Sequence, residues 1–313
     1  MNTEHPRTTA ALAAALSLLA GCAGTGHAPG GQRAFPSAEA AVLALVDALR
    51  GNDSARLAEI FGPEGADLVS SGDPVSDKNN AATFVQAYDV HHELVLGPEQ
   101  ATLVVGADDW ELPIPVVRVG EDWCFDTEAG KDEILARRIG ENELSTIQVC
   151  RALVDAQEEY LAVARSAGGQ GEYAQKFRSD DGTRNGLYWD VRAGEAESPL
   201  GPLVAQALAE GYGGNKDKKD EEARALYGYR FHMLTAQGDS APGGTRSYLA
   251  GGHMTGGFAV VAWPAQYDAS GVMTFLVSDD GVVYQRDLGP DTDKLAQAMT
   301  AFDPGPEWAV VPE

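Results

Sequence analysis

Basic residues are scarce in this sequence. Its 313 residues include 23 lysines and arginines against 47 aspartates and glutamates, and the formal net charge is −24 at pH 7. Proteins that bind nucleic acid need a positive surface that contacts the phosphates. We therefore expect no nucleic acid among the partners of this protein. An acidic surface also disfavours direct contact between the folded part of the chain and anionic lipid.

Motifs for catalysis and for metal or phosphate binding are missing as well. The chain has no Gly-x-Ser-x-Gly elbow, no glycine-rich phosphate loop ending in Lys-Ser or Lys-Thr, and no His-Glu-x-x-His helix. The only adjacent histidines, His91 and His92, point in different directions at the end of a helix and form no metal pair by themselves. We therefore predict no catalytic residues, no metal and no cofactor, and we favour a non-enzymatic protein.

Long hydrophobic runs are also rare, and the longest lies near the N-terminus. After a short polar start, residues 10–20 form an apolar segment that is too short for a stable membrane-spanning helix. The segment ends in Leu19-Ala20-Gly21-Cys22, which resembles the lipobox of bacterial lipoproteins. The resemblance implies that residues 1–22 are a lipoprotein signal peptide, and that Cys22 is lipidated and becomes the mature N-terminus. Several lipid chains on one cysteine anchor a protein firmly in a membrane.

Residues 23–34 are rich in glycine and lack periodicity, which predicts a flexible tether behind the lipid. Ala23 follows the cysteine where an aspartate would signal retention, so the analogy with lipoprotein sorting favours the outer membrane in a Gram-negative host. We expect an exported protein whose N-terminal lipid anchors it in the cell envelope. In such a host it would face the periplasm.

Cysteine is limited to three residues, and Cys124 and Cys150 remain once Cys22 is assigned to the lipid. Exported proteins enter compartments that permit disulfides. A bond between Cys124 and Cys150 would stabilise the fold by about 3 kcal/mol. The alternative is two buried thiols that pack as small apolar side chains. The sequence leaves both possibilities open.

Residues 35–130 predict a first α+β unit. Ser37 and Asp53 are suited to cap two helices that end at Gly51 and Gly62, and a third helix is expected over residues 81–91. Short β-type runs separated by turn residues then follow at 93–96, 101–106, 114–119 and 123–126. Helices followed by an antiparallel meander look like the nuclear transport factor 2-like or cystatin-like class.

Residues 131–165 have the longest helical periodicity in the chain. Leu144, Ile147, Cys150, Val154 and Leu161 recur at helical spacing and predict a buried stripe. We expect this helix to join the first unit to a second unit, and we assign residues 131–313 to the helix and the second unit together.

The second unit is predicted to be rich in β-structure. A short helix is expected at 200–211 and a final helix at 292–302, with strands at 228–234, 258–263, 272–278 and 282–287. A long helix packed on an antiparallel sheet is similar to the globular heads of type IV pilin-like proteins. Several aromatic residues can either line a ligand groove or pack in the core: Tyr188, Trp189, Tyr227, Tyr229, Phe231, Tyr248 and Trp263.

Charged and amide side chains gather around the start of the long helix. They are Asp126, Glu128, Glu133, Arg137, Arg138, Asn142 and Glu143. Glu133 and Arg137 stand four residues apart in the order that favours an ion pair on a helix. The group can form an ion network that ties the helix to the sheet. Alternatively, it can supply carboxylates and an anion clamp to a ligand or substrate.

Several short motifs follow one another along the chain in a fixed order. They include Asp108-Asp109-Trp110, Trp123-Cys124-Phe125-Asp126-Thr127, Val154-Asp155-Ala156-Gln157, Gly186-Leu187-Tyr188-Trp189 and Ser198-Pro199-Leu200-Gly201. Together they resemble the bacterial family catalogued as domain of unknown function 2950, from about Phe35 to Trp308. The resemblance implies an exported envelope protein, and it brings no activity or catalytic residues to carry over.

Three functions are compatible with these features. We favour a non-enzymatic envelope lipoprotein that binds an envelope protein partner or a small ligand. The first alternative is an envelope hydrolase or isomerase with a pocket in the first unit, in which Asp126, Glu128 or His92 acts as acid or base. The second is an adaptor associated with a pilus or with secretion, which the pilin-head-like second unit suggests.

Overall fold

The computed structural model describes residues 31–166, 171–191, 194–209, 212 and 225–312. The predicted signal peptide, the lipidation site Cys22 and tether residues 23–30 lie outside this part of the chain. The predicted tether, 23–34, is wrong at its end, because Gln32 Nε2 donates to the Phe61 carbonyl and the Arg33 amide donates to the Glu59 carbonyl, each over 2.8 Å. None of the described helices is both long and apolar enough to cross a membrane. The described elements are helices and mainly antiparallel strands, which confirms the α+β class.

The chain begins with a group of helices: α1 (Ala38–Arg50), α2 (Ser54–Phe61), the 3₁₀-helix η2 (Pro63–Gly65), α3 (Ala66–Val69) and α4 (Pro74–Val90). Ser37 accepts a hydrogen bond from the Ala40 amide, and Asp53 accepts one from the Arg56 amide, so both predicted N-caps are confirmed. The third predicted helix is too short at its start. Helix α4 begins at Pro74 because Asp73 accepts from the free amides of the first turn and proline fits that position.

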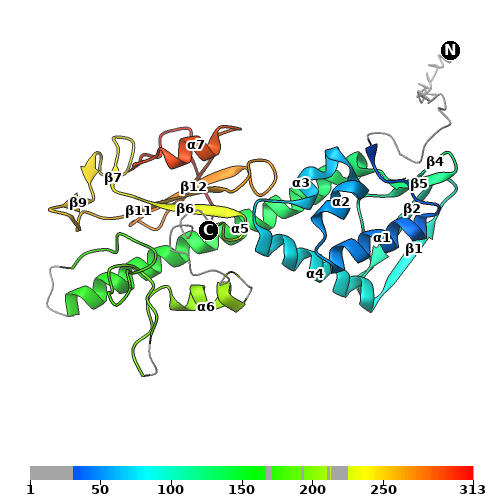
Figure 1. Ribbon diagram of the computed structural model, residues 1–313. Helices are drawn as coiled ribbons and strands as arrows, with labels where there is room; N and C mark the ends of the chain where they lie inside the picture. Colours follow the sequence, from blue (N-terminus) through cyan, green and yellow to red (C-terminus); the bar gives the residue numbers. More distant parts are fainter. Residues whose placement is uncertain (1–30, 167–170, 192–193, 210–211, 213–224, 313) are drawn as a thin grey trace, which may run out of the picture.

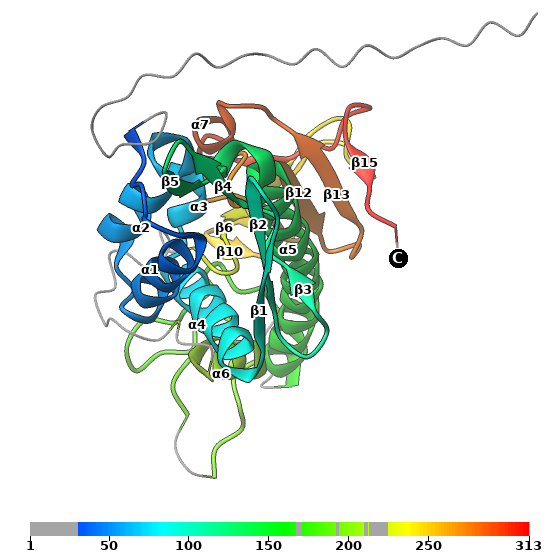
Figure 2. The ribbon, with the colours of Figure 1, turned by 90° about the vertical axis from the view of Figure 1, so that its right-hand side faces the viewer.

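An antiparallel sheet follows these helices (Figure 2). Its strands are β1 (His92–Leu96), β2 (Gln100–Val105), β3 (Trp110–Glu111), β4 (Val116–Val119) and β5 (Asp122–Phe125). The order is β1-β2-β4-β5, with β3 paired to β2, and the four predicted strands are all present. Helix α1 and the sheet enclose a hydrophobic core that includes Leu45, Ile60, Leu103 and Phe125.

Helix α5 (Thr127–Ser166) is 40 residues long and runs from the first group of elements to the second (Figure 1). This confirms the predicted long helix, which begins four residues earlier than expected. The predicted stripe is wrong at Leu144, whose side chain is 65% exposed. Polar Asn142 and Gln157 are buried instead, because their amide groups bond to backbone atoms of neighbouring segments.

A second sheet lies against α5. Its strands are β6 (Tyr229–Leu234), β11 (Ala259–Pro264), β12 (Met273–Ser278), β13 (Val283–Asp287) and β15 (Ala309–Val310), in the antiparallel order β15-β13-β12-β11-β6. Shorter strands lie beside it: β7 (Ala236–Gln237), β8 (Arg246–Ser247), β9 (Leu249–Ala250), β10 (His253–Met254) and β14 (Ala301–Phe302). The remaining helices are α6 (Gly201–Ala209) and α7 (Thr292–Gln297). The predicted final helix is thus too long, since Phe302 pairs in a strand and is buried.

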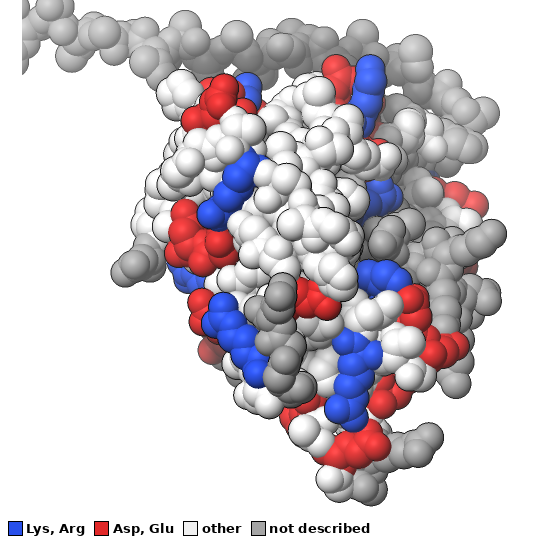
Figure 3. Space-filling model, turned by 90° about the vertical axis from the view of Figure 1, so that its left-hand side faces the viewer, with Lys and Arg blue, Asp and Glu red and all other residues white. Residues whose placement is uncertain are grey.

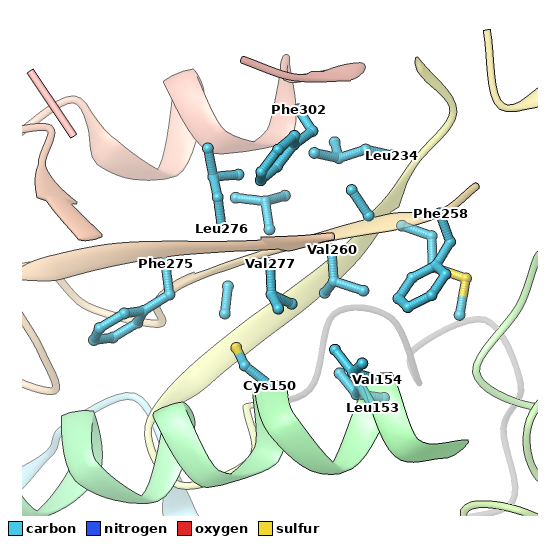
Figure 4. Packing of buried hydrophobic residues seen from close by; sticks show 14 of the residues in the cluster. Cys150, Leu153, Val154, Leu234, Phe258, Val260, Phe275, Leu276, Val277 and Phe302 are labelled. Atoms are coloured by element: carbon cyan, nitrogen blue, oxygen red, sulfur yellow. The ribbon is translucent and has the colours of Figure 1, made fainter. Parts of the chain in front are cut away.

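The second core has side chains on both faces of this sheet. Figure 4 shows Cys150 and Leu153 of α5 pointing towards Phe275 and Val277, while Leu276 points to the opposite face, which α7 covers. The alternation along β12 explains why one strand can serve both layers.

The two cysteines that could have formed a disulfide, Cys124 and Cys150, are both free thiols in this structure. Cys124 is buried on β5, and Cys150 is buried in the second core. Burial raises the pKa of the Cys150 thiol to about 12. Burial also raises the pKa of Cys124, and the nearby carboxylate of Asp126 adds to this effect.

Cys150 makes the stability of the fold sensitive to alkaline pH. Its thiol has an ordinary pKa of 9.0, which rises to about 12 in the folded protein. The stability associated with the neutral thiol is therefore complete below pH 9 and is lost as pH rises towards 12. Urea unfolding at two pH values, roughly 8 and 10, should show a loss that is about 1 kcal/mol smaller in Cys150→Ala than in the wild type. Equal losses in the two proteins would contradict the burial of this thiol.

Candidate functional site

A cavity of about 610 Å³ lies between α5, α6 and β6. Its lining comes from α5, from the segment 176–188, from α6 and from the start of β6. The lining residues are Val149, Leu153, Lys176, Phe177, Arg178, Ser179, Asp180, Tyr188, Leu200, Leu203, Val204, Ala207, Tyr212, Ala225, Leu226 and Phe231. Ten of these side chains are aliphatic or phenylalanine rings, so the interior is mainly apolar. The volume is within the range of small-molecule sites, roughly 300–1,000 Å³.

Two helices form the apolar walls of the cavity. Val149 and Leu153 belong to the buried face of α5, and both side chains are only 3% exposed. Leu203, Val204 and Ala207 face them from α6. The first turn of α6 is fixed to the wall beside it, because the Leu200 amide donates to the Leu187 carbonyl over 3.1 Å.

The third wall of the cavity is the segment 174–188, and Gln157 attaches it to α5. Its side chain is fully buried, its amide nitrogen donates to the Ala174 carbonyl, and its amide oxygen accepts from the Ala174 amide, both over 2.8 Å. The Gln157 side chain thereby supplies Ala174 with the donor and the acceptor that a neighbouring strand would otherwise provide. Further along, the Tyr188 amide donates to the Phe177 carbonyl over 2.8 Å, which folds the segment back on itself. The wall that carries Lys176 to Asp180 is consequently held at both ends.

One side of the cavity is polar and carries two cations and one carboxylate, from Lys176, Arg178 and Asp180. Lys176 Nζ lies 2.6 Å from Asp180 Oδ2, and the Arg178 guanidinium stacks over the Tyr188 ring at 5.3 Å. A smaller polar hollow of about 240 Å³ shares Arg178 and Asp180 with the cavity. Arg178 also lies 3.4 Å from Asp190 Oδ2, so each cation of the lining has a carboxylate partner.

On one face of the molecule, the acidic and basic side chains are mixed rather than gathered in separate patches. On the face shown in Figure 3, acidic and basic side chains alternate with uncharged ones across the described residues. The described part of this face therefore carries no large basic patch.

Tyr212 lines the cavity and also contacts the first group of elements. Its hydroxyl donates to Asp73 Oδ2 over 2.8 Å and accepts from the Tyr227 amide over 3.1 Å. Burial raises the pKa of the Tyr212 hydroxyl, and the Asp73 carboxylate raises it further. The hydroxyl therefore stays protonated at neutral pH and remains a donor to Asp73.

The charged residues predicted around the start of the long helix do not form one site. Asp126 accepts from the Ala129 amide at the start of α5, and Glu128 is exposed. Glu133 and Arg137 form the predicted ion pair, with N–O distances of 2.9 and 2.6 Å. Asp126 and Glu143 are 17 residues apart, which places them roughly 25 Å apart along a helix.

The other members of that group bind backbone groups. Arg138 donates to the carbonyls of Asp67 and Leu68, and burial lowers the pKa of its guanidinium against the opposing effect of Asp77 and Asp67. Asn142 donates to the Ser270 carbonyl over 2.9 Å, and Glu143 accepts from the amides of Val272 and Met273. These contacts tie α5 to α3 in the first group of elements and to the edge of β12 in the second sheet.

A second cavity of about 410 Å³ lies in the first group of elements, between α1, α4 and the start of α5. Arg137 and Arg138 are among its lining residues, whereas Asp126, Glu128 and His92 are not. His92 stacks on Tyr88 with ring centroids 3.9 Å apart. The acid and base residues predicted for an enzyme in this unit therefore lie outside its cavity.

The aromatic residues singled out in the sequence divide between the core and the site. Tyr229, Tyr248 and Trp263 are buried in the second core, while Tyr188 and Phe231 line the cavity. Sequence reasoning missed Lys176, Arg178 and Tyr212, which have no local pattern to mark them. The apolar positions of the short helix at 200–209 were the available signal for that wall.

Among the residues that the structure describes, no group of three or more histidine, cysteine or carboxylate side chains is placed to hold a metal ion. In the loop from Asp180 to Asn185, the polar side chains form hydrogen bonds with other groups of the same loop. The Asp180 amide donates to Asn185 Oδ1, and Asn185 Nδ2 donates to Asp180 Oδ2.

Comparison with protein-family models shows which family the chain belongs to. The model described as "Protein of unknown function (DUF2950)" matches residues 32–311, and the chain belongs to this family. No curated protein and no solved structure matches the chain. The similarities to nuclear transport factor 2-like or cystatin-like folds and to pilin heads therefore stay predictions.

Gln157 gives a direct test of how the cavity wall is held. Gln157→Ala leaves the buried N–H and C=O of Ala174 without partners, and we expect a loss of about 2–4 kcal/mol in the free energy of unfolding. Gln148→Ala on the exposed side of the same helix is the matched control and should change it by less than about 0.5 kcal/mol. Urea denaturation followed by circular dichroism measures both. Similar stabilities for the two variants would show that the wall does not depend on this side chain.

Proposed function

We propose that this protein is a lipid-anchored protein of the cell envelope that binds an amphiphilic small molecule in the cavity between α5 and α6. The ligand class is an apolar chain or ring system with one anionic group. The proposal describes binding without turnover, and the shape and lining of the cavity carry it.

The apolar walls favour the body of such a ligand. Leu153, Leu203, Val204 and Phe231 provide aliphatic and aromatic surface on opposite sides of the space. Each square ångström of apolar ligand surface removed from water contributes about 25 cal/mol. A chain of ten to twelve methylenes would thus gain several kcal/mol, from about 0.8 kcal/mol per buried methylene, before the cost of ordering is subtracted.

The polar side of the cavity favours an anionic head group. Lys176 and Arg178 supply two positive charges there, and the carboxylates of Asp180 and Asp190 each pair with one of them. Asp180 lies 2.6 Å from Lys176, and Asp190 lies 3.4 Å from Arg178, so a ligand carboxylate would share the two cations with these side chains. Arginine binds a carboxylate through two parallel hydrogen bonds, which also orients the ligand.

The lipid anchor is the second part of the proposal. Lipid on Cys22 and a tether over residues 23–30 would hold the folded part near the membrane, in the envelope. A glycine-rich tether of eight residues has a mean end-to-end distance of roughly 16 Å. The cavity would then remain close to a source of amphiphilic molecules. A protein partner in the envelope is compatible with this arrangement and would receive or deliver the ligand.

Filling the cavity tests the binding proposal. Ala207→Trp places a large side chain in the space between α5 and α6, and we expect the affinity for dansyl-aminoundecanoic acid to fall at least tenfold, which is about 1.4 kcal/mol. Ala205→Trp on the exposed side of the same helix is the matched control and should keep wild-type affinity. Fluorescence titration, with laurate as competitor, measures the affinity. Equal binding by both variants, or no displacement by laurate, would place the probe elsewhere.

Changing the lipidation site tests the anchor. Cys22→Ala should move the protein from the membrane fraction to the soluble fraction of cells and abolish incorporation of an alkyne-tagged fatty acid. Cys124→Ala is the control, because that thiol is buried and should leave labelling unchanged. Immunoblotting of the fractions and gel detection of the tag give the two measurements. Labelling that persists in Cys22→Ala would contradict a lipid on this residue.

A further inference from the structure

The carboxylate of Asp73 is shared between the two groups of elements. It lies in the first group, where Oδ1 accepts from the amides of Val75 and Ser76 at the start of α4, each over 3.1 Å. Its other oxygen, Oδ2, accepts from the Tyr212 hydroxyl and from the Gly228 amide, each over 2.8 Å. The residue is only 1% exposed. A helix cap needs Oδ1 alone, so the role of Oδ2 lies entirely with the second group.

Gly228 is shaped for this contact. Its φ angle is +74°, and a Cβ at this position would collide with the Asn142 side chain of α5 and approach Ser270. Glycine adopts this conformation without a steric penalty. The backbone can therefore approach both α5 and Asp73, and its N–H points at the carboxylate.

The second donor to Asp73 is a wall of the cavity. Tyr212 lines the space between α5 and α6, and its ring packs edge-on against Tyr227 with centroids 5.7 Å apart. Its hydroxyl is bonded to Asp73 on one side and to the Tyr227 amide on the other. Two hydrogen bonds and one ring contact thus fix the position of the ring, and one of them comes from the first group of elements.

We infer that Asp73 is a positioning residue for the α5–α6 cavity, through which the first group of elements sets the ligand affinity of the second. The inference rests on the proposed function of that cavity. Asp73 does not line the cavity itself. It holds the Tyr212 ring in place through a hydrogen bond. Removing this bond at Asp73 changes the shape of the site but removes no lining atom. Removing it by Tyr212→Phe takes away only the hydroxyl.

The same geometry links binding to the contact between the two groups. A ligand that packs against Tyr212 favours the ring position in which its hydroxyl reaches Asp73. By thermodynamic reciprocity, the docked first group then favours the ligand to the same degree. Other contacts across the boundary do not involve the cavity lining, such as Gln266 Nε2 donating to Asp67 Oδ1 over 3.2 Å.

A double-mutant cycle on the intact chain tests this inference, with dansyl-aminoundecanoic acid as the probe. Asp73→Asn keeps an oxygen for the α4 amides but places an N–H₂ group towards Tyr212 and the Gly228 N–H. Tyr212→Phe keeps the ring and removes the hydroxyl. We expect each single variant to weaken binding about fivefold or more, the lower end of coupling between linked sites. The double variant should bind no more weakly than the weaker single variant.

Asp53→Asn is the matched control, since Asp53 also caps a helix, α2, where it accepts from the Arg56 amide, but it is not among the residues that line the cavity. It should bind within twofold of the wild type, which separates the contact to Tyr212 from the loss of a helix cap. Full multiplication of the two single effects, or wild-type affinity in both single variants, would overturn the inference while leaving the proposed function intact. A wild-type protein that binds no probe would instead overturn the proposed function, and the inference with it.

Discussion

The fold depends on one helix that has to be buried by two separate cores. Helix α5 begins beside the first sheet, passes Asn142 and Glu143, and then lies across the second sheet with Cys150 and Leu153 inward. A purely apolar stripe could not meet both surroundings, because the helix also passes backbone groups that need partners. Asn142, Glu143 and Gln157 supply those partners from the helix itself. Their buried hydrogen bonds fix the rotation of α5 about its axis.

The cavity follows from this arrangement. The second sheet covers only part of the apolar side of α5. Val149 and Leu153 therefore also face α6 and the segment that Gln157 holds. Helix α6 and this segment are attached at their ends, and a cavity separates their middle parts from α5. Apolar side chains therefore face this cavity. Lys176 and Arg178 lie on one side of the cavity, so its two sides differ in polarity. The cavity is thus a consequence of how α5 is covered, and its function as a binding site remains a proposal.

Local signals in the sequence were sufficient for most of the elements. Ser37 and Asp53 marked helix starts, Gly51 and Gly62 marked helix ends, and the strands of both sheets stood out by their composition. The helix over residues 131–165 was recognisable, but its buried face was not. Leu144 is apolar and exposed, while Gln157 is polar and fully buried, because a partner distant in sequence decides each case. Asp73 was hidden for the same reason: Tyr212 and Gly228 are about 140 and 155 residues away.

The most direct test of the account is a crystal structure of the protein grown with laurate. We predict that the aliphatic chain lies between α5 and α6 in contact with Leu153 and Phe231, with its carboxylate towards Lys176 and Arg178 and with the Tyr212 hydroxyl still bonded to Asp73. A cavity filled by the protein's own side chains, with laurate absent or bound on another surface, would contradict the account.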